Sequence, residues 1–232
     1  MAKMKNYQRI NHFPGMYILA RKNHLGRNLM RMQREFPNDY KFFPKTWLLP
    51  SEFASFRAQW NPKKPKTYIV KPEDQSQGRG IFLARSLDQI DPTAHCVVQS
   101  YLHKPYLIDE LKFDMRIYVL LTGSDPLRIY LYNEGLGRLA TEPYVNPSKS
   151  NLNTLYMHLT NYSINKNNKN FIFNDDKDAD DVGHKRSLTS VLQYLEDEEG
   201  VDTEQLMNKI KDVIIKTICI AQPTLAHSYY SC

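Results

Sequence analysis

Three ionisable residues, Lys112, Asp114 and Arg116, occupy every second position of the segment KFDMRIYVL (112–120). Side chains of a strand alternate between its two faces, so these residues and Tyr118 would share one face. Lysine can donate to a phosphate, aspartate can bind a metal ion or a hydroxyl group, and arginine can hold a phosphate or carboxylate with two hydrogen bonds. The row therefore predicts either the floor of an anion site or an exposed sheet face with cross-strand ion pairs.

A second group of candidates follows the segment KTYIVK, where Lys71 ends a predicted strand. The next loop contains Gln77, Gly78 and Gly80, and glycines allow a backbone to approach a phosphate closely. The loop matches neither the Walker pattern GxxxxGK[ST] nor GxGxxG. By itself it is also consistent with a plain turn, but beside a second lysine-bearing strand it suggests a nucleotide held between two sheets.

Two further segments could complete such a site. Gln99 to Leu102 (QSYL) ends another strand and could act as a hinge whose backbone meets an adenine edge, or it is an ordinary strand end. The segment MHLTNYSINK supplies His158, Thr160 and Asn161, whose hydrogen-bonding groups suit ribose, phosphate or a metal-bound water. Taken alone, His158 is better interpreted as a structural histidine whose hydrogen bonds are satisfied.

Alternation and helical periodicity predict the elements that must position these residues. The apolar positions 113, 115, 117, 119 and 121 would face the core, and the following strand repeats the scheme with Arg128, Tyr130, Tyr132 and Glu134 on the polar face. Strands are expected over 66–71, 81–84, 95–102, 112–122, 127–133 and 137–141. Helices are expected over 24–35, 51–60, 188–195 and 202–221, the last ended by Pro223, with a loop over 141–186 that includes a mobile surface segment at 174–186. The pattern indicates an α+β fold of mostly antiparallel strands with helices on one side.

Composition bounds the class of protein. The 232 residues are 41% hydrophobic and 24% charged, which is typical of a globular chain of one large or two small domains. No apolar run approaches the ~20 residues needed to cross a bilayer, and residues 1–16 contain no signal-peptide stretch. Cys96, Cys219 and Cys232 show neither disulfide nor metal spacing and are expected to be reduced thiols.

Charge is uneven along the chain. Its net value is +6, yet residues 1–50 contain ten Lys or Arg against Glu35 and Asp39, a net of +8. This basic front half is either a solvated face or attracts an anionic partner such as a nucleotide or an acidic peptide. No zinc-finger or RNP pattern is present, so nucleic acid is not favoured.

Seven blocks in order resemble the tubulin tyrosine ligase-like family, from about Asn11 to the end of the chain. The blocks are NHFPGM, RKNHLGRNLMRM, FFPKTWLLP, YIVKP…QGRGIFL, VVQSYLHKPYLID, KFDMRIYVLLTGSDPLRIYLYNEGLGR and MHLTNYSINK. This resemblance implies an ATP-grasp ligase that joins an amino acid to tubulin tails through an acyl-phosphate. KFDMRIYVL with MHLTNYS is similar to the glutamate-adding branch, which implies a tubulin polyglutamylase.

The resemblance also assigns roles to residues. It implies that Lys71 binds ATP phosphate, that the loop through Gln77, Gly78 and Gly80 closes over the phosphates, and that Gln99 and Leu102 flank the adenine. Arg116 and Arg138 would stabilise the phosphoryl and acyl-phosphate charge or hold a substrate carboxylate. The remaining nucleotide contacts would come from Lys22, Lys112, Asp114, His158, Thr160 and Asn161.

The family pattern implies three parts: a basic substrate-side region over 1–65, a central ATP-grasp subdomain with the phosphate loop over 66–104, and a C-terminal ATP-grasp subdomain over 105–232. The expected fold is ATP-grasp-like, with two mostly antiparallel sheets, flanking helices and an incomplete last subdomain. In the family, acidic and Asn ligands for Mg²⁺ come from a segment that resembles FEILGFDI…PWLLEVN, which this sequence lacks. We therefore expect the Mg²⁺ ligands beyond residue 232, no metal site in the acidic run 175–181, and an inactive chain if these 232 residues act alone.

The expected partners are ATP, Mg²⁺, glutamate and the C-terminal tails of tubulin or microtubules, with neither nucleic acid nor membrane. The expected location is the cytoplasm and cytoskeleton, with the cilium or basal body as a further option. Two alternatives stay open at this point: a short protein that binds tubulin tails or nucleotide without catalysis, and a ligase of the same fold that acts on another acidic protein.

Overall fold

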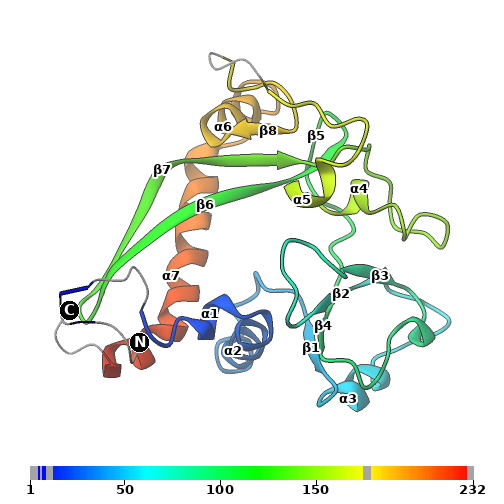
Figure 1. Ribbon diagram of the computed structural model, residues 1–232, viewed down its shortest axis with the longest axis horizontal. Helices are drawn as coiled ribbons and strands as arrows, with labels where there is room; N and C mark the ends of the chain where they lie inside the picture. Colours follow the sequence, from blue (N-terminus) through cyan, green and yellow to red (C-terminus); the bar gives the residue numbers. More distant parts are fainter. Residues whose placement is uncertain (1–4, 6, 9–12, 175–178, 229–232) are drawn as a thin grey trace.

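The computed structural model describes residues 5, 7–8, 13–174 and 179–228, which include short helices as well as two sheets (Figure 1). Its helices are α1 (Tyr17–Ala20), α2 (Lys22–Glu35), α3 (Phe53–Ala58), α4 (Leu155–His158), α5 (Tyr162–Asn165), α6 (Leu188–Asp197), α7 (Thr203–Ser228) and the 3₁₀ turn η1 (Leu87–Gln89). Its strands are β1 (Thr46–Leu49), β2 (Tyr68–Pro72), β3 (Phe82–Ala84), β4 (Cys96–Ser100), β5 (Leu107–Ile108), β6 (Leu111–Ser124), β7 (Leu127–Leu139) and β8 (Lys185–Ser187).

The strands form two four-stranded sheets, in the orders β1-β4-β2-β3 and β5-β6-β7-β8. Every pair of neighbours is antiparallel. The predicted α+β class with two antiparallel sheets is therefore confirmed, and it is consistent with an ATP-grasp-like fold. β1 belongs to the expected region 1–65 but pairs with β4 of the expected central subdomain, and the division into three parts stays a prediction.

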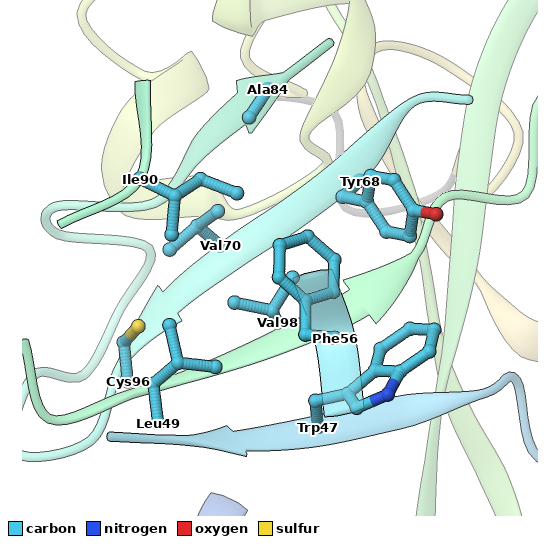
Figure 2. Close-up of a cluster of buried hydrophobic side chains, with 9 residues drawn as sticks. All are labelled: Trp47, Leu49, Phe56, Tyr68, Val70, Ala84, Ile90, Cys96 and Val98. Atoms are coloured by element: carbon cyan, nitrogen blue, oxygen red, sulfur yellow. The ribbon is translucent and has the colours of Figure 1, made fainter. Parts of the chain in front are cut away.

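An aromatic cluster forms the core of the first sheet. Alternate residues of β2 and β4 point to the same side, where Phe56 of α3 lies among Trp47, Tyr68 and Val98 (Figure 2). The Phe56 side chain is fully buried. Its ring centroid lies 5.0 Å from that of Tyr68 and 5.3 Å from that of Trp47, in edge-to-face geometry. This core fixes the sheet, and Lys71 of β2 projects from the opposite face.

The second sheet is dominated by the long β6–β7 hairpin, which crosses helix α7 in Figure 1. Helix α6 packs against β7 where two glycines remove side chains: a Cβ on Gly137 would lie 2.4 Å from Val191 Cγ2, and one on Gly135 would lie 2.4 Å from the Arg116 carbonyl oxygen. Val191 is completely buried. Gly137 therefore permits the close contact between α6 and the sheet, and Gly135 permits the close approach of β7 to the backbone of β6.

One residue of the expected polar row caps a helix. The β6–β7 register shifts between Ile117 and Val119, so the alternation does not continue unchanged along β7. As a result Glu134 turns to helix α6, where its carboxylate accepts hydrogen bonds from the Leu188 N–H at 2.8 Å and the Thr189 hydroxyl at 2.6 Å. Glu134 therefore caps the first turn of α6, a role that strand alternation alone does not indicate, and its place on the polar face stays a prediction.

Other expectations needed correction. Helix α7 continues past Pro223 to Ser228, since packing of its last turns outweighs the loss of one hydrogen bond: Leu225 is fully buried and lies against Gly15. The predicted strand 137–141 is the end of β7. The predicted loop 141–186 contains α4, α5 and the start of β8, and residues 175–178 of its expected mobile part lie outside the described residues.

Within the part of the chain that the structure describes, no helix, α7 included, combines the length and the apolar character required to cross a membrane.

Candidate active site

An ion pair between neighbouring strands marks the centre of the candidate site. Asp114 of β6 lies directly opposite Arg138 of β7. The Arg138 guanidinium donates from Nε to Oδ1 at 2.7 Å and from Nη2 to Oδ2 at 2.6 Å, and the Thr160 hydroxyl donates to the same carboxylate at 2.7 Å. The hydrogen bonds that Arg138 donates to Asp114 raise the pKa of Arg138. Asp114 thus fixes the guanidinium, whose other N–H groups have no hydrogen-bond partner among the described residues and can serve a ligand.

Lys112, two residues earlier on β6, is held in a polar cage. Its Nζ donates to the His158 carbonyl at 2.9 Å and to the Tyr101 hydroxyl at 3.1 Å, and it lies 4.7 Å from the centre of the Tyr101 ring. Burial, and secondarily the charge of Lys71, lower the pKa of Lys112 to about 8, although Asp114 acts in the opposite direction. A partly desolvated ammonium of this kind is stabilised by an anionic ligand.

Lys71 reaches the same region from the other sheet. Its Nζ donates to Gln99 Oε1 at 2.9 Å, and the Gln99 amide in turn donates to the Thr46 hydroxyl at 2.9 Å. Burial lowers the pKa of Lys71, and the charge of Lys22 adds to the effect. Two cationic side chains from two different sheets therefore converge, as the sequence suggested.

The glycine-containing loop after β2 lies against helix α5. Gln77, Gly78 and Gly80 all have positive φ angles, of 60°, 84° and 66°. A Cβ on Gly78 would lie 2.5 Å from Ile164 Cδ1, and the Ser163 hydroxyl donates to the Gln77 carbonyl at 2.5 Å. A glycine is needed at position 78 because both the backbone conformation and the contact exclude a side chain.

Lys22 holds the first part of this loop. Its Nζ donates to the carbonyls of Pro72, at 2.6 Å, Glu73, at 3.4 Å, and Gln75. As the first residue of α2, it connects that helix to the loop. In this arrangement the ammonium stabilises the loop backbone, and a direct contact with a nucleotide would require some of these hydrogen bonds to be exchanged.

A cavity of about 260 Å³ lies beside the ion pair on the polar face of β6, β7 and β8. Its cationic lining consists of Arg116, Arg138 and Lys185, and its walls include Tyr162 and Phe171. The sequence pattern did not indicate Lys185 as a site residue, because it lies at the end of the predicted loop 141–186. It begins β8, which is too short, at three residues, to show an alternating pattern.

The comparisons with known proteins bear on this site. A family model described as "Tubulin-tyrosine ligase family" matches residues 1–231. The chain belongs to the tubulin-tyrosine ligase family. This confirms the resemblance inferred from the seven sequence blocks.

Its similar relatives within the tubulin-tyrosine ligase family include a "Probable beta-tubulin polyglutamylase" of Tetrahymena thermophila, 62% identical over all of this chain and 20% of the relative. "Tubulin polyglutamylase TTLL13" of Mus musculus is 50% identical over 99% of this chain and 28% of the relative. "Tubulin polyglutamylase TTLL7" of Xenopus tropicalis is 43% identical over all of this chain and 26% of the relative. The chain thus spans less than a third of the length of these relatives.

Some sequence candidates occupy supporting positions in this member of the tubulin-tyrosine ligase family. The His158 ring is completely buried, with Nδ1 3.2 Å from the Tyr101 hydroxyl and Nε2 3.1 Å from the Asn151 carbonyl. Burial lowers its pKa, which favours the neutral ring. A direct contact with a nucleotide would break one of these hydrogen bonds, so the geometry favours a role in placing Lys112. Leu102 is 65% exposed and free to contact a ligand.

Two residues that the sequence did not single out support the family site. Tyr101 joins Lys112 to His158, and it falls inside the QSYL segment that the strand pattern had marked. Asn165, the last residue of α5, is almost fully buried and accepts from the Thr141 N–H at 3.1 Å while its amide donates to the Leu159 carbonyl at 2.7 Å. Its position in an Asn-rich stretch gave no signal that it would be a core hydrogen-bonding residue.

Nucleotide binding to this site should depend on pH through Lys112. A bound phosphate raises the pKa of the ammonium, so binding above about pH 8 must take up a proton, and affinity should fall as the pH rises through 8. At high pH the association constant for nucleotide should fall about tenfold for each unit of pH. Titration calorimetry of ATP at pH 8.5 in two buffers of different ionisation enthalpy measures this uptake. The Lys112→Arg variant stays charged at this pH, so the proton uptake that comes from Lys112 should disappear. Equal proton uptake in the unsubstituted protein and in Lys112→Arg would contradict Lys112 as the group that takes up the proton.

Proposed function

We propose that the protein is an ATP-dependent ligase that adds glutamate to glutamate residues of tubulin C-terminal tails. Relatives named tubulin polyglutamylases support the addition of glutamate to tubulin. The observation that carries the proposal is the convergence of Lys71 and Lys112 behind the glycine loop. Both are half-buried lysines with lowered pKa values, and neither forms an ion pair with a carboxylate among the described residues. Such a pair suits the phosphates of a nucleotide.

Each part of the site has a role in this proposal. Lys71, Lys112 and the backbone of Gln77, Gly78 and Gly80 would bind the phosphates. The segment from Gln99 to Leu102 would lie along the adenine. Thr160 and Asn161 would serve the ribose side, while Asp114, His158 and Lys22 hold Arg138, Lys112 and the loop in place.

The proposed reaction has two steps. A carboxylate of the tail attacks the γ-phosphorus of ATP, so a phosphoryl–oxygen bond forms and ADP leaves. The amine of the incoming glutamate then attacks the resulting acyl-phosphate carbonyl, so an amide bond forms while phosphate and a proton are released. Both steps bring anions together, and Arg116 and Arg138 would stabilise that charge.

Magnesium is part of the expected chemistry, but the described residues do not form a site for it. They contain no group of three or more His, Cys, Asp or Glu side chains that could hold a metal ion. Asp114 is already engaged by Arg138 and Thr160. The expectation that Mg²⁺ ligands lie beyond residue 232 stays a prediction, and the steps above use only side chains of this chain.

Charge complementarity supports an acidic tail as the substrate. Arg27, Arg31 and Arg34 are exposed and recur every three or four residues on one face of α2, which we call the arginine face. Among the described residues none of the three forms an ion pair. The helix starts at Lys22, beside the phosphate loop, so a tail along the arginine face would approach the site. With such a substrate, the protein would act in the cytoplasm on the cytoskeleton, with the cilium or basal body as a further option.

Incorporation of labelled glutamate tests the proposal. Because the Mg²⁺ ligands are expected beyond residue 232, the assay uses the full-length protein. It is incubated with ATP, Mg²⁺ and a peptide of the tubulin tail, and amide-linked product is measured by mass spectrometry. ATP-dependent product that disappears in Lys71→Met is the expected result, and its rate should fall with ionic strength as the arginine face is screened. ATP and tail binding without any product would support a binding protein instead, and product on other acidic proteins alone would move the substrate away from tubulin.

A further inference from the structure

Gln77 of the glycine-containing loop has a backbone conformation that needs support from its neighbours. Its φ angle of 60° lies in the left-handed region, which residues with side chains rarely adopt and which persists only where the surrounding structure fixes it. The turn within the loop is closed by the Arg79 N–H, which donates to the Ser76 carbonyl at 3.1 Å and leaves the Gln77 carbonyl for another partner. That carbonyl accepts a hydrogen bond at 2.5 Å from the hydroxyl of Ser163, 86 positions further along the chain.

A second contact joins the same two segments. Gly78 packs against Ile164, and a Cβ on the glycine would lie 2.5 Å from Ile164 Cδ1 and 3.1 Å from Asn161 Cγ. The loop leaves β2 of the first sheet, whereas α5 comes after β7 of the second sheet. Ser163 and Ile164 therefore dock a loop of one sheet on a helix that follows the other.

The segment that receives the loop is itself firmly anchored. Asn165 is almost fully buried, and its side-chain oxygen accepts hydrogen bonds from the Thr141 N–H at 3.1 Å and the Thr141 hydroxyl at 2.9 Å. The Thr160 hydroxyl donates at 2.7 Å to the carboxylate of Asp114, which also holds Arg138. This segment thus contacts both the loop and the ion pair, so a docked loop has a fixed position relative to Arg138.

We propose that Ser163 is a positioning residue for nucleotide binding, because its hydroxyl holds the glycine-containing loop against α5. The inference rests on the proposed function, in which the backbone of this loop binds the phosphates. Ser163 acts through the Gln77 carbonyl: a loop that is already docked loses less conformational freedom when nucleotide binds, which increases the affinity. Loss of the hydroxyl shifts the loop toward undocked conformations.

Proteolysis at Arg79 measures this shift, because the residue is exposed and lies inside the loop. The full-length protein is treated with a low concentration of trypsin without ATP, and mass spectrometry follows the cleavage after Arg79. Cleavage of a transiently opened segment is proportional to the population of its open form. In Ser163→Ala the rate should increase roughly three- to tenfold, which is the typical effect of one lost hydrogen bond. Ser163→Thr, which keeps a hydroxyl, should restore most of the original rate.

Two controls make the result specific to the loop. Ser51→Ala removes a similar bond, from a serine hydroxyl to the Leu48 carbonyl at 3.1 Å, and should leave cleavage after Arg79 unchanged. Cleavage after the exposed Arg57 of α3 should be equal in the unsubstituted protein and in Ser163→Ala. Faster cleavage after Arg79 alone supports the role of Ser163. An unchanged rate after Arg79 in Ser163→Ala, or an equal increase after Arg57, overturns it.

Binding of ATP separates this inference from the proposed function. Calorimetric titration should give a higher ATP dissociation constant for Ser163→Ala than for the unsubstituted protein, by up to the factor measured for cleavage. An equal dissociation constant in both proteins overturns the role of Ser163 in nucleotide binding. Absence of ATP binding to the unsubstituted protein overturns the proposed function, and the cleavage rate without ATP still decides whether Ser163 holds the loop. ATP binding without product overturns only the ligase proposal.

Discussion

Arg138→Met should lower the kcat of glutamate incorporation by a factor of about 10² to 10³, which is the typical cost of removing one preorganised group that stabilises transition-state charge. The side chain is fixed by two hydrogen bonds from its guanidinium to Asp114, so its remaining donors need no reorganisation during the reaction. The loss should appear mainly in kcat and less in the KM for ATP, because Lys71 and Lys112 still hold the phosphates.

The control for this experiment is Arg128→Met, an exposed arginine on the distal half of the same strand. Asp114→Asn adds a second test, since it keeps the size of the side chain but removes the charge that orients Arg138. It should reduce kcat in the same direction and leave the fold intact by circular dichroism. If Arg138→Met and Arg128→Met had equal kcat values, Arg138 would have no part in catalysis.

The largest effect on stability is expected for Phe56→Ala, which should lower the free energy of unfolding by about 3–5 kcal/mol. The ring is fully buried among Trp47, Tyr68 and Val98 (Figure 2), and its removal leaves a cavity in a core of rigid aromatic neighbours. Urea unfolding followed by tryptophan fluorescence measures the change through the midpoint and the m-value.

Phe36→Ala provides the comparison, because that ring is 52% exposed and its loss should change stability by about 0.5 kcal/mol or less. The destabilised Phe56→Ala protein should retain nucleotide affinity at temperatures where it is folded, since Phe56 has no contact with the site. A loss below about 1 kcal/mol would mean that the first sheet has a core other than this cluster.

Alternation and periodicity predicted the residues whose surroundings are local. The row of Lys112 and Asp114 on one face of β6 follows from the two-residue period of a strand, and the apolar spacing of α6 and α7 follows from the helical period. Arg138 could be paired with Asp114 only once the hairpin register was known. The position of Glu134 could not be predicted because a bulge has no clear signature in the sequence.

Contacts between distant segments were the other limit. Lys22 was expected to face a nucleotide, yet it binds carbonyls about 50 positions away. His158 looked like a ligand or a core residue, and only the fold shows both ring nitrogens occupied. Lys185 was hidden in a segment without periodicity. These residues depend on tertiary neighbours, which a local pattern does not contain.

The three carbonyl contacts of Lys22 make helix α2 and the phosphate loop a single mechanical unit. A ligand that changes the equilibrium position of the helix changes that of the loop, and the nucleotide acts on the helix through the same bonds. Thermodynamic linkage makes such an effect reciprocal: if an acidic peptide on the arginine face tightens ATP binding by some factor, ATP tightens peptide binding by the same factor. A single lysine thus gives the two proposed substrates a route to heterotropic cooperativity.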